Sequence, residues 1–379
     1  MAGLPRYHAG PQSLRPIELD LPMPNFRKLI HYARTVKHHH GKPYARQLLD
    51  LARVAAGRQQ LGASEYYELG VFDDNAYPAG QKLDCVGWRA SARIDLALNQ
   101  SIWRATANDK LLNYAMLQHH GFPIPRTQAC YSPLGRHIGT ERRPRTRQEL
   151  EDFLCTDMRF PAFIKPVHGS YGRDTYLLQA FDAAQKKFVD SHGKDVPLVD
   201  LLDTCMNSRF TGMLFQDCLR PHPQVRALVG NTTSCVRVIV AVPKTGPQVH
   251  LAFWKIARVH NITDNFCMGE TGNLLAWVNK QTGTVERVVS GLWPDGQAVT
   301  QHPDTGQTIA GTTLPDWQAA MTMCLAAAVH FPGLKLQHWD VAFCEEGPVL
   351  MELNTEADLG VPQYLGQAPF INQTIRDML

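Results

Sequence analysis

The stretch 336–354 reads LQHWDVAFCEEGPVLMELN and decides the fold that we predict for this chain. Two apolar runs flank the triplet EEG, so we interpret the stretch as a β-hairpin. Three-residue hairpin loops favour glycine at their left-handed position, and Gly347 fits that position. Cys344 then pairs with Pro348, and this pair fixes the register of the whole hairpin.

Three oxygen-bearing side chains meet at one end of the predicted hairpin. The register places Asp340 directly opposite Glu352, at the separation of about 5 Å that is typical of cross-strand partners. Asn354 lies two residues beyond Glu352 and points to the same face, opposite His338. The other face is predicted to belong to the core and carries Trp339, Val341, Phe343, Val349, Met351 and Leu353.

Two carboxylates this close repel each other unless a cation or a proton lies between them. Asp340, Glu352 and Asn354 offer hard oxygen donors, which suit a Mg²⁺ ion that keeps some of its waters and shares phosphate oxygens. We therefore predict a magnesium site here. The alternative is an ordinary solvated pair of acids, but the placement of both acids on one face, opposite each other, argues against it.

A second stretch, FPAFIKPVHGSYGRDTYLL at 160–178, places a lysine at the end of an apolar run and a glycine-containing loop after it. Lys165 supplies a cation and the loop supplies exposed backbone N–H groups, which together hold phosphate in many proteins. In a P-loop the lysine follows the glycines, whereas here it precedes them. We therefore expect the loop to fold back over the phosphates as a flap, although strand-capping lysines and glycine turns are also common without this role.

The composition is that of a soluble, globular chain of 379 residues, long enough for two or three domains. The hydrophobic fraction is 44%, the charged fraction 19% and the net charge +3, which alone indicates no partner. No run of about 18 apolar residues and no signal-peptide apolar region are present, so we expect a cytoplasmic protein without a membrane span. Nine scattered cysteines favour reduced thiols.

The first 60 residues are rich in cations. The segments FRKLIHYARTVK and PYARQLLDLARVAAG repeat apolar positions three and four apart, which predicts two helices with His38–His40 in the loop between them. The cations that face few acids are Arg27, Lys28, Arg34, Lys37, Lys42, Arg46, Arg53 and Arg58. The simpler interpretation is a solvated helical surface, and the alternative is a surface that meets acidic lipid or an anionic polymer.

Strands dominate from about residue 160. Helices are expected at 146–157, 197–209 and 315–330, the first with a capping box from Thr146 and Glu149. Strands are expected at 162–165, 174–179, 212–217, 234–242, 248–258, 273–279, 284–290, 336–344 and 348–353. Strands with interspersed helices and several hairpins predict an α+β fold.

The order of these features resembles the ATP-grasp superfamily. The matching stretches are NDKLLNYAMLQHHGFPIPRT, FPAFIKPVHGSYGRD, MLFQDCL, SCVRVIVAV and WDVAFCEEGPVLMELNTEADL. Within the superfamily the chain looks most similar to the sugar-transfer-associated ATP-grasp group, through NDK, HPDTGQTIAG and TDNFCMGETGNLLAWVN as well as the hairpin. The resemblance implies an ATP-grasp domain at 105–379, whose two α+β subdomains clasp ATP with a lid at about 160–217, and a mainly helical accessory region at 1–104.

The resemblance also implies which residues contact ATP. In chain order they are Lys110, Lys165, His168, Gly169, Ser170, Gly172, Gln216, Asp217 and Leu219. The two lysines correspond to phosphate ligands, 168–173 to the mobile flap, and 216–219 to the hinge that recognises adenine and ribose. Many family members have glutamate where this chain has Asp217, and the shorter side chain would reach the ribose differently.

Further roles follow from the same resemblance. The hairpin triad Asp340, Glu352 and Asn354 resembles the magnesium ligands of the superfamily. Arg237 resembles the arginine that steadies the transferred phosphoryl group, with a structural salt bridge as the alternative. Asn265 is similar to the asparagine in the R…N…GG loop of glutathione-synthetase-like ligases, with Arg258 as the arginine of that loop, although the insertion FCMGET departs from the compact pattern.

The resemblance implies an ATP-dependent carboxylate–amine ligase that works through an acylphosphate and releases ADP and phosphate. Its cofactors would be ATP and Mg²⁺, and its substrates a small-molecule or glycan-linked carboxylate and amine in cell-surface glycan or secondary-metabolite biosynthesis. No nucleic-acid partner is indicated. Three alternatives stay open: a kinase that uses the same site without amine attack, a non-enzymatic ATP-binding module, and a protein that binds polyanions through residues 27–58.

Overall fold

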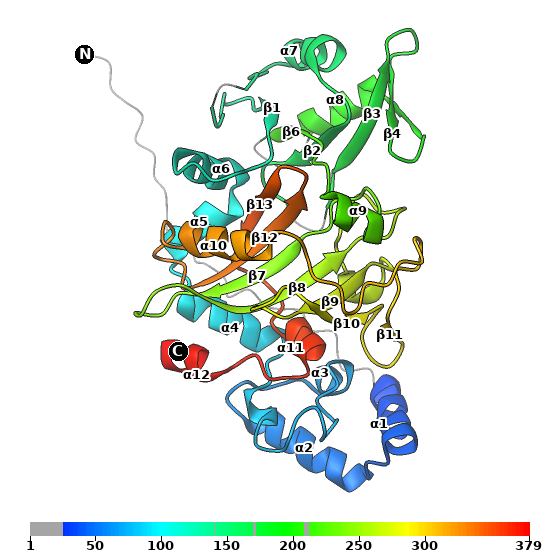
Figure 1. The fold of residues 1–379 in the computed structure, drawn as a ribbon, viewed down its shortest axis with the longest axis vertical. Coiled ribbons are helices and arrows are strands. Elements are labelled where there is room, and N and C mark those ends of the chain that lie inside the picture. The colour runs from blue at the N-terminus through cyan, green and yellow to red at the C-terminus, as the bar shows by residue number, and fades with distance from the viewer. Residues whose placement is uncertain (1–25, 140, 170–171, 208–211) are drawn as a thin grey trace, which may run out of the picture.

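The computed structural model describes residues 26–139, 141–169, 172–207 and 212–379. Along the long axis of the molecule, a small sheet lies at one end, a large sheet in the middle, and the first helices at the other end (Figure 1). Both sheets are built from antiparallel strands with helices packed against them, so the predicted α+β class is confirmed. No described helix is long and apolar enough to cross a membrane.

The small sheet contains six strands in the described residues, in the order β1-β6-β2-β3-β4-β5. Their bounds are β1 (Thr127–Tyr131), β2 (Ala162–Pro166), β3 (Tyr176–Asp182), β4 (Lys187–Asp190), β5 (Asp195–Pro197) and β6 (Met213–Asp217). The helices α7 (Arg147–Asp152) and α8 (Leu198–Asn207) and the π-helical turn η2 (Phe153–Asp157) share its core. The predicted capping box is present, because Thr146 Oγ1 accepts a hydrogen bond from Glu149 N at 3.2 Å.

The large sheet contains seven described strands in the order β11-β10-β9-β8-β7-β12-β13. Their bounds are β7 (Val236–Ala241), β8 (Gln248–Ile256), β9 (Leu274–Val278), β10 (Val285–Val289), β11 (Ala298–Val299), β12 (Leu336–Cys344) and β13 (Gly347–Asn354). One core forms where this sheet packs with α9 (Pro223–Val229) and α10 (Trp317–Ala328). The short 3₁₀ turn η3 (Cys267–Gly269) belongs to the loop between β8 and β9.

The first residues of the described chain are helical, as predicted. Their elements are α1 (Phe26–His40), α2 (Tyr44–Ala56), α3 (Ala63–Glu68), η1 (Lys82–Asp84), α4 (Trp88–Leu98), α5 (Ser101–Asn108) and α6 (Lys110–His119). The prediction of a loop at His38–His40 is wrong, because these residues form the last turn of α1. The helix ends at His40 and is followed by Gly41, whose φ of 67° favours glycine.

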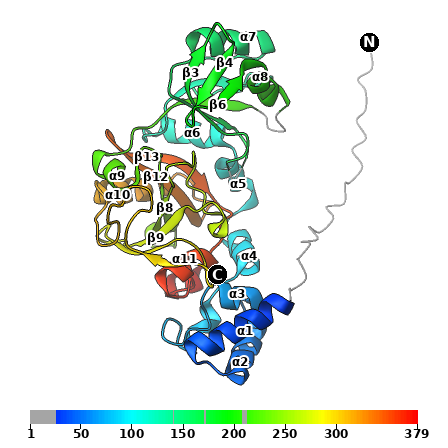
Figure 2. The same ribbon diagram turned by 90° about the vertical axis from the view of Figure 1, so that its right-hand side faces the viewer.

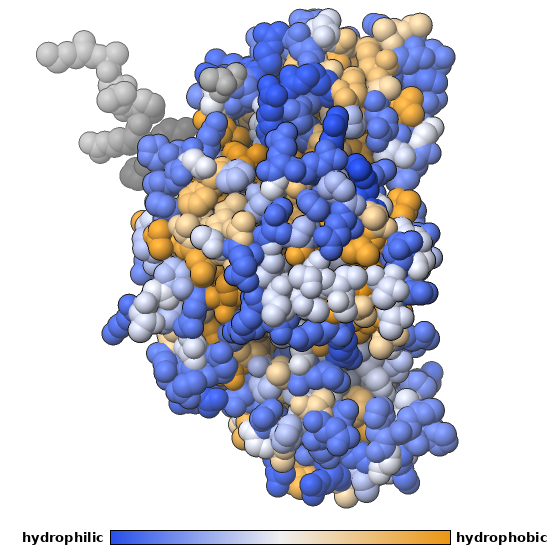
Figure 3. All heavy atoms as spheres, in the orientation of Figure 1, coloured by the Kyte–Doolittle hydropathy of each residue, from blue (hydrophilic) through white to orange (hydrophobic). Residues whose placement is uncertain are grey.

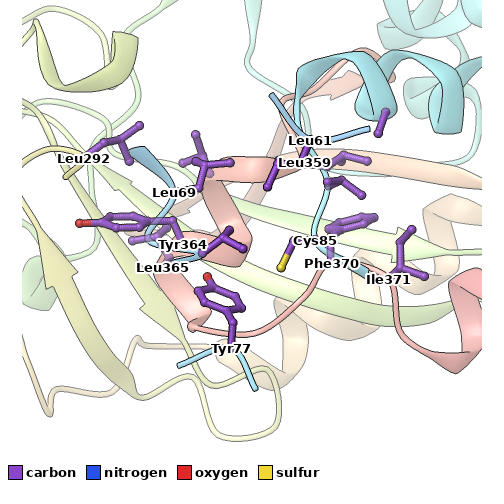
Figure 4. Packing of buried hydrophobic residues seen from close by; sticks show 14 of the residues in the cluster. Leu61, Leu69, Tyr77, Cys85, Leu292, Leu359, Tyr364, Leu365, Phe370 and Ile371 are labelled. Carbon is purple, nitrogen blue, oxygen red and sulfur yellow. The ribbon is translucent and has the colours of Figure 1, made fainter. Parts of the chain in front are cut away.

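The N-terminal region and the large sheet share one hydrophobic core (Figure 4). Leu61, Leu69 and Tyr77 pack there against the C-terminal helix α11 (Gly360–Gly366) and the segment that leads to α12 (Gln373–Met378). Tyr77 Oη donates a hydrogen bond to Gln363 O at 2.6 Å. Residues 61–98 therefore form one packed body with the large sheet.

The β12–β13 hairpin confirms the predicted pairing at its functional end and corrects it at its turn. Asp340 pairs with Glu352, and His338 pairs with Asn354, as expected. The turn has two residues rather than three, because Cys344 pairs with Gly347, and a bulge next to Asp340 restores the predicted register. The bulge also changes the faces, so that Leu350 enters the sheet core while Val349 and Met351 pack on the opposite side with Cys235, Ala342 and Cys344.

Candidate active site

A cavity of about 880 Å³ is lined by residues of both sheets. The small sheet contributes Lys165 and Gln216, and the large sheet contributes Arg237, Asp340 and Glu352. The other predicted residues that line it are Lys110, His168, Gly169, Gly172, Asp217, Leu219, Asn265 and Asn354. Residues predicted from segments up to 244 positions apart in the sequence therefore meet around one space; Ser170 lies outside the described residues.

Asp340 is the centre of a buried charge cluster on the large sheet. Arg237 on the adjacent strand β7 binds it with both arms of its guanidinium, through Nε to Oδ1 at 2.8 Å and Nη2 to Oδ2 at 2.6 Å. Lys255 Nζ on β8 lies 3.2 Å from Oδ2. Burial of Asp340 opposes its ionisation, but the two cations outweigh burial and hold the pKa of the carboxyl well below its usual range.

Two lysines approach the hairpin from the side of the small sheet. Lys110, the first residue of α6, lies with Nζ 3.0 Å from Glu352 Oε1 and also donates to Gly169 O at 3.1 Å. Lys165 at the end of β2 donates from Nζ to Tyr114 Oη at 2.9 Å. Tyr114 Oη in turn donates to Met351 O at 2.8 Å, so the tyrosine connects Lys165 to the hairpin.

The predicted flap begins and ends with ordered contacts. Asp109 caps the N-terminus of α6, accepting from Leu111 N, and its Oδ2 lies 3.2 Å from His168 Nε2. Gly172, with φ of 69°, lies so close to the loop after β8 that a Cβ atom there would be 3.2 Å from Thr263 Cγ2. The flap residues of the small sheet thus reach the large sheet at the edge of the cavity.

The predicted hinge residues lie at the end of β6. Gln216 is 1% exposed and donates from Nε2 to Thr127 Oγ1 at 3.3 Å. Asp217 is held by Arg159, whose Nη2 lies 3.0 Å from Asp217 Oδ1. Any ribose contact by Asp217 therefore has to share the carboxylate with an arginine.

Arg258 does not reach the cavity. Its guanidinium binds Asp304, with Nε 2.9 Å from Oδ1, and Val259 N donates to the same carboxylate at 2.8 Å. Asn265 does line the cavity, and its backbone oxygen accepts from Asn273 Nδ2 at 2.7 Å. Asn265 therefore lies at the cavity, whereas Arg258 lies outside its lining.

Sequence reasoning missed three residues that organise the site. Lys255 interrupts the apolar strand LAFWKIA, and that isolated charge was the signal for a buried functional lysine. Asp264 accepts from Lys255 Nζ at 3.0 Å and from Cys235 N at 2.7 Å, which fixes the lysine beside Asp340. Tyr114 gives no comparable signal, because it reads as one more apolar position of an amphipathic helix.

A family model described as sugar-transfer-associated ATP-grasp matches residues 89–375. The chain belongs to this family. Its match covers both sheets and every predicted site residue, and it starts within α4, before the boundary predicted at residue 105. None of the curated proteins that were compared matches the chain.

Several solved structures of ATP-grasp enzymes are distantly similar to the chain. VanG D-Ala:D-Ser ligase from Enterococcus faecalis is 10% identical, with 74% of this chain and 64% of that chain covered and a TM-score of 0.39. Biotin carboxylase from Campylobacter jejuni is 9% identical, with 72% and 45% covered and a TM-score of 0.38. The chain thus spans about half to two thirds of these structures, and at such TM-scores they add no argument to the family match.

The donor set of this ATP-grasp protein fits a magnesium ion. No group of three or more His, Cys, Asp or Glu is suitably placed among the described residues, so the candidate ligands are two carboxylates and an amide. Glu352 is partly open to the cavity, and its Oε1 contacts Lys110. Asp340 Oδ1 accepts one hydrogen bond from Arg237 and keeps a further lone pair for a metal ion. The amide nitrogen Nδ2 of Asn354 lies 3.4 Å from Asp340 Oδ2, so the amide oxygen of Asn354 stays available as a ligand.

Proposed function

We propose that this protein joins a carboxylate to an amine at the expense of ATP, through an acylphosphate, with release of ADP and phosphate. The observation that carries the proposal is the convergence of Lys110, Lys165, Arg237 and Lys255 with Asp340 and Glu352 around one cavity, in a member of an ATP-grasp family. Phosphoryl transfer depends on positioning and charge neutralisation, and this cavity supplies both. The proposed setting is cell-surface glycan or secondary-metabolite biosynthesis.

In this proposal the small sheet holds the nucleotide. Lys165 and Lys110 contact the phosphates, and Gln216, Asp217 and Leu219 contact the adenine and ribose. Lys110 then exchanges part of its contact with Glu352 for phosphate oxygens. The flap residues His168, Gly169, Ser170 and Gly172 close over the phosphates and keep water from the acylphosphate.

The large sheet positions the reacting groups. Arg237 and Lys255 are fixed by Asp340 and Asp264, so their positive charge is in place before the reaction and needs no reorganisation. Asp340, Glu352 and Asn354 would hold Mg²⁺, which supplies charge neutralisation at the phosphate oxygens. The carboxylate oxygen attacks the γ-phosphorus, the bond to the β-phosphate oxygen breaks, and ADP leaves. Asn265 orients the acyl group from the loop after β8.

We place the two substrates against the apolar residues of the cavity lining, which include Phe266, Leu275 and Val361. Thr355, which follows the proposed metal ligand Asn354, is 1% exposed, lines the cavity and has no hydrogen-bond partner for Oγ1 among the described residues. An unpaired buried hydroxyl is costly, and a polar substrate group that bonds to it would remove that cost.

Trapping with hydroxylamine tests the proposal before either natural substrate is known. Hydroxylamine attacks an acylphosphate and gives a hydroxamate and phosphate. The protein should form hydroxamates from at least one member of a carboxylate panel, with ATP and Mg²⁺ required, and Arg237→Met should abolish the signal. Arg258→Met is the matched control and should retain it, because Arg258 lies outside the cavity.

The kinase alternative predicts a different outcome. A carboxylate kinase would give hydroxamates as well, and it is distinguished by ADP formation without release of phosphate when the carboxylate and the amine are both present. A hydroxyl kinase would form ADP with a hydroxyl-bearing acceptor, its phosphorylated product would be stable to hydroxylamine, and no carboxylate would give a hydroxamate. That result would contradict the ligase proposal while leaving the nucleotide site intact.

A further inference from the structure

Helix α2 has an apolar face with no partner among the described residues. Gln47, Asp50 and Val54 turn inward and are buried. On the outward side, Leu48 is 65% exposed and Leu49 43% exposed. A helix normally buries its apolar stripe, so two exposed leucines on one short helix indicate a surface that is covered in use.

Helix α1 carries an exposed stripe of its own. Phe26 and Ile30 are exposed and lie four residues apart, and Arg34 continues the same stripe. Lys37 connects α1 to α2, because its Nζ lies 4.7 Å from the centre of the Tyr44 ring. The surface, which we call the basic face, consists of Phe26, Ile30, Arg34, Lys37, Tyr44, Arg46, Leu48, Leu49 and Arg53.

The charge of the basic face is strongly one-sided. The basic face carries four cations, Arg34, Lys37, Arg46 and Arg53, and no acid. Asp50, the one acid among residues 26–58, is buried with Lys42 and Lys82. Within the part of the chain that the structure describes, no acidic side chain pairs with any of the cations of the basic face. Figure 3 shows hydrophobic residues among hydrophilic ones at this end of the molecule.

We propose that the basic face docks on a membrane surface that carries anionic lipid. Exposed leucine, phenylalanine and tyrosine among arginine and lysine form the side-chain pattern of interfacial helices, with apolar groups at the acyl boundary and cations at the headgroups. A second copy of the chain fits less well, because a two-fold contact would place this positive face against itself. The face lies at the opposite end of the molecule from the small sheet, so docking leaves the lid unobstructed (Figure 2).

Vesicle sedimentation with the full chain tests the proposal. The protein should bind phosphatidylcholine vesicles that contain about 30% phosphatidylserine and should not bind vesicles of phosphatidylcholine alone. Binding should be lost at about 1 M salt, where the Debye length falls to about 3 Å. Arg46→Gln with Arg53→Gln should weaken binding at least about tenfold, since each basic residue near the surface contributes about a fivefold factor. Leu48→Ser with Leu49→Ser should weaken it by a similar factor.

The matched control carries Leu134→Ser with Arg143→Gln, because both residues are exposed on the small-sheet side of the molecule. This variant should bind vesicles like the wild type. The proposal is overturned if the wild type does not bind anionic vesicles, or if the control variant loses binding as strongly as the other variants. It is also overturned if the protein doubles its mass with rising concentration and the leucine substitutions affect only this dimerisation. That last result would assign the face to a second copy of the chain. None of these outcomes depends on ligase activity.

Discussion

At the scale of single residues, Asp340 has a structural role in addition to its proposed role as a metal ligand. It is a proposed ligand, and it is also the counter-ion of two buried cations, Arg237 and Lys255. Removing one partner of a buried ion pair leaves an uncompensated charge, which typically lowers the free energy of unfolding by about 3–5 kcal/mol. Loss of activity in an Asp340 variant would therefore mix a chemical with a structural effect.

We predict that Asp340→Ala lowers the free energy of unfolding by about 3–5 kcal/mol, measured by urea denaturation. Glu352→Gln should lower it far less, because Glu352 is partly open to the cavity, whereas Asp340 is buried and pairs with both Arg237 and Lys255. An Asp340→Ala protein with wild-type stability would show that Arg237 and Lys255 do not depend on this carboxylate. The Glu352 variant is accordingly the cleaner probe of the metal site.

Much of the site could be predicted from residue types and their spacing. The opposition of Asp340 and Glu352 follows from strand alternation and a short turn, which are local properties. Lys255, Asp264 and Tyr114 could not be placed in the same way, because their contacts join strands and helices whose packing is decided by the whole core. The pairing of Arg258 with Asp304 was not predictable for the same reason, since the two residues lie 46 positions apart.

At the scale of elements, the long apolar strands were predictable and the short polar ones were not. The expected strand 336–344 coincides with β12, whereas β4 and β5 in KFVD and DVP carry too few apolar residues for alternation to reveal them. The hairpin turn was predicted one residue too long. A β-bulge compensated for that error, and bulges have no reliable signal in a single sequence.

Strand β8 carries a histidine that makes stability depend on pH. His250 Nε2 lies 3.0 Å from Phe370 O and its ring packs on Phe370, which ties the C-terminal segment to the large sheet. Burial lowers the pKa of His250 to about 4. The hydrogen bond with Phe370 opposes this shift, and the charge of Lys280 adds to it. The unfolded chain therefore takes up this proton near pH 6.5, while the folded chain takes it up only near pH 4.

Because the unfolded state binds more protons in this window, the free energy of unfolding should fall as the pH falls from about 6.5 toward 4. The slope expected from His250 is about 1.4 kcal/mol per pH unit, or roughly 2 kcal/mol between pH 6.5 and 5. Urea denaturation at several pH values measures this free energy of unfolding. It should fall less steeply with falling pH in His250→Gln than in the wild type. The control His192→Gln, whose replaced side chain is exposed, should give the same curve as the wild type. Parallel curves for the wild type and His250→Gln would refute this assignment.

At the scale of the whole molecule, the structure brings two sheets together around one cavity and joins the N-terminal helices to the larger sheet. The predicted division at residue 104 follows from the extent of the family resemblance. In the structure a single core runs from Leu61 through Phe253 to Phe370, so the N-terminal region supports the sheet that carries the proposed catalytic residues. None of the described residues before Ala107 lines the cavity, and the described N-terminal residues contact the large sheet through the shared core.

The central claim is that a nucleotide with its metal ion binds between the two sheets, and calorimetric titration with ATP and Mg²⁺ tests it most directly. The wild type should bind, and Lys165→Met from the small sheet and Glu352→Gln from the large sheet should each weaken binding at least about tenfold, the effect of one lost charge-assisted contact. Lys187→Met, which removes a lysine of the small sheet outside the cavity, should bind like the wild type. Undiminished affinity in both cavity variants would contradict the account.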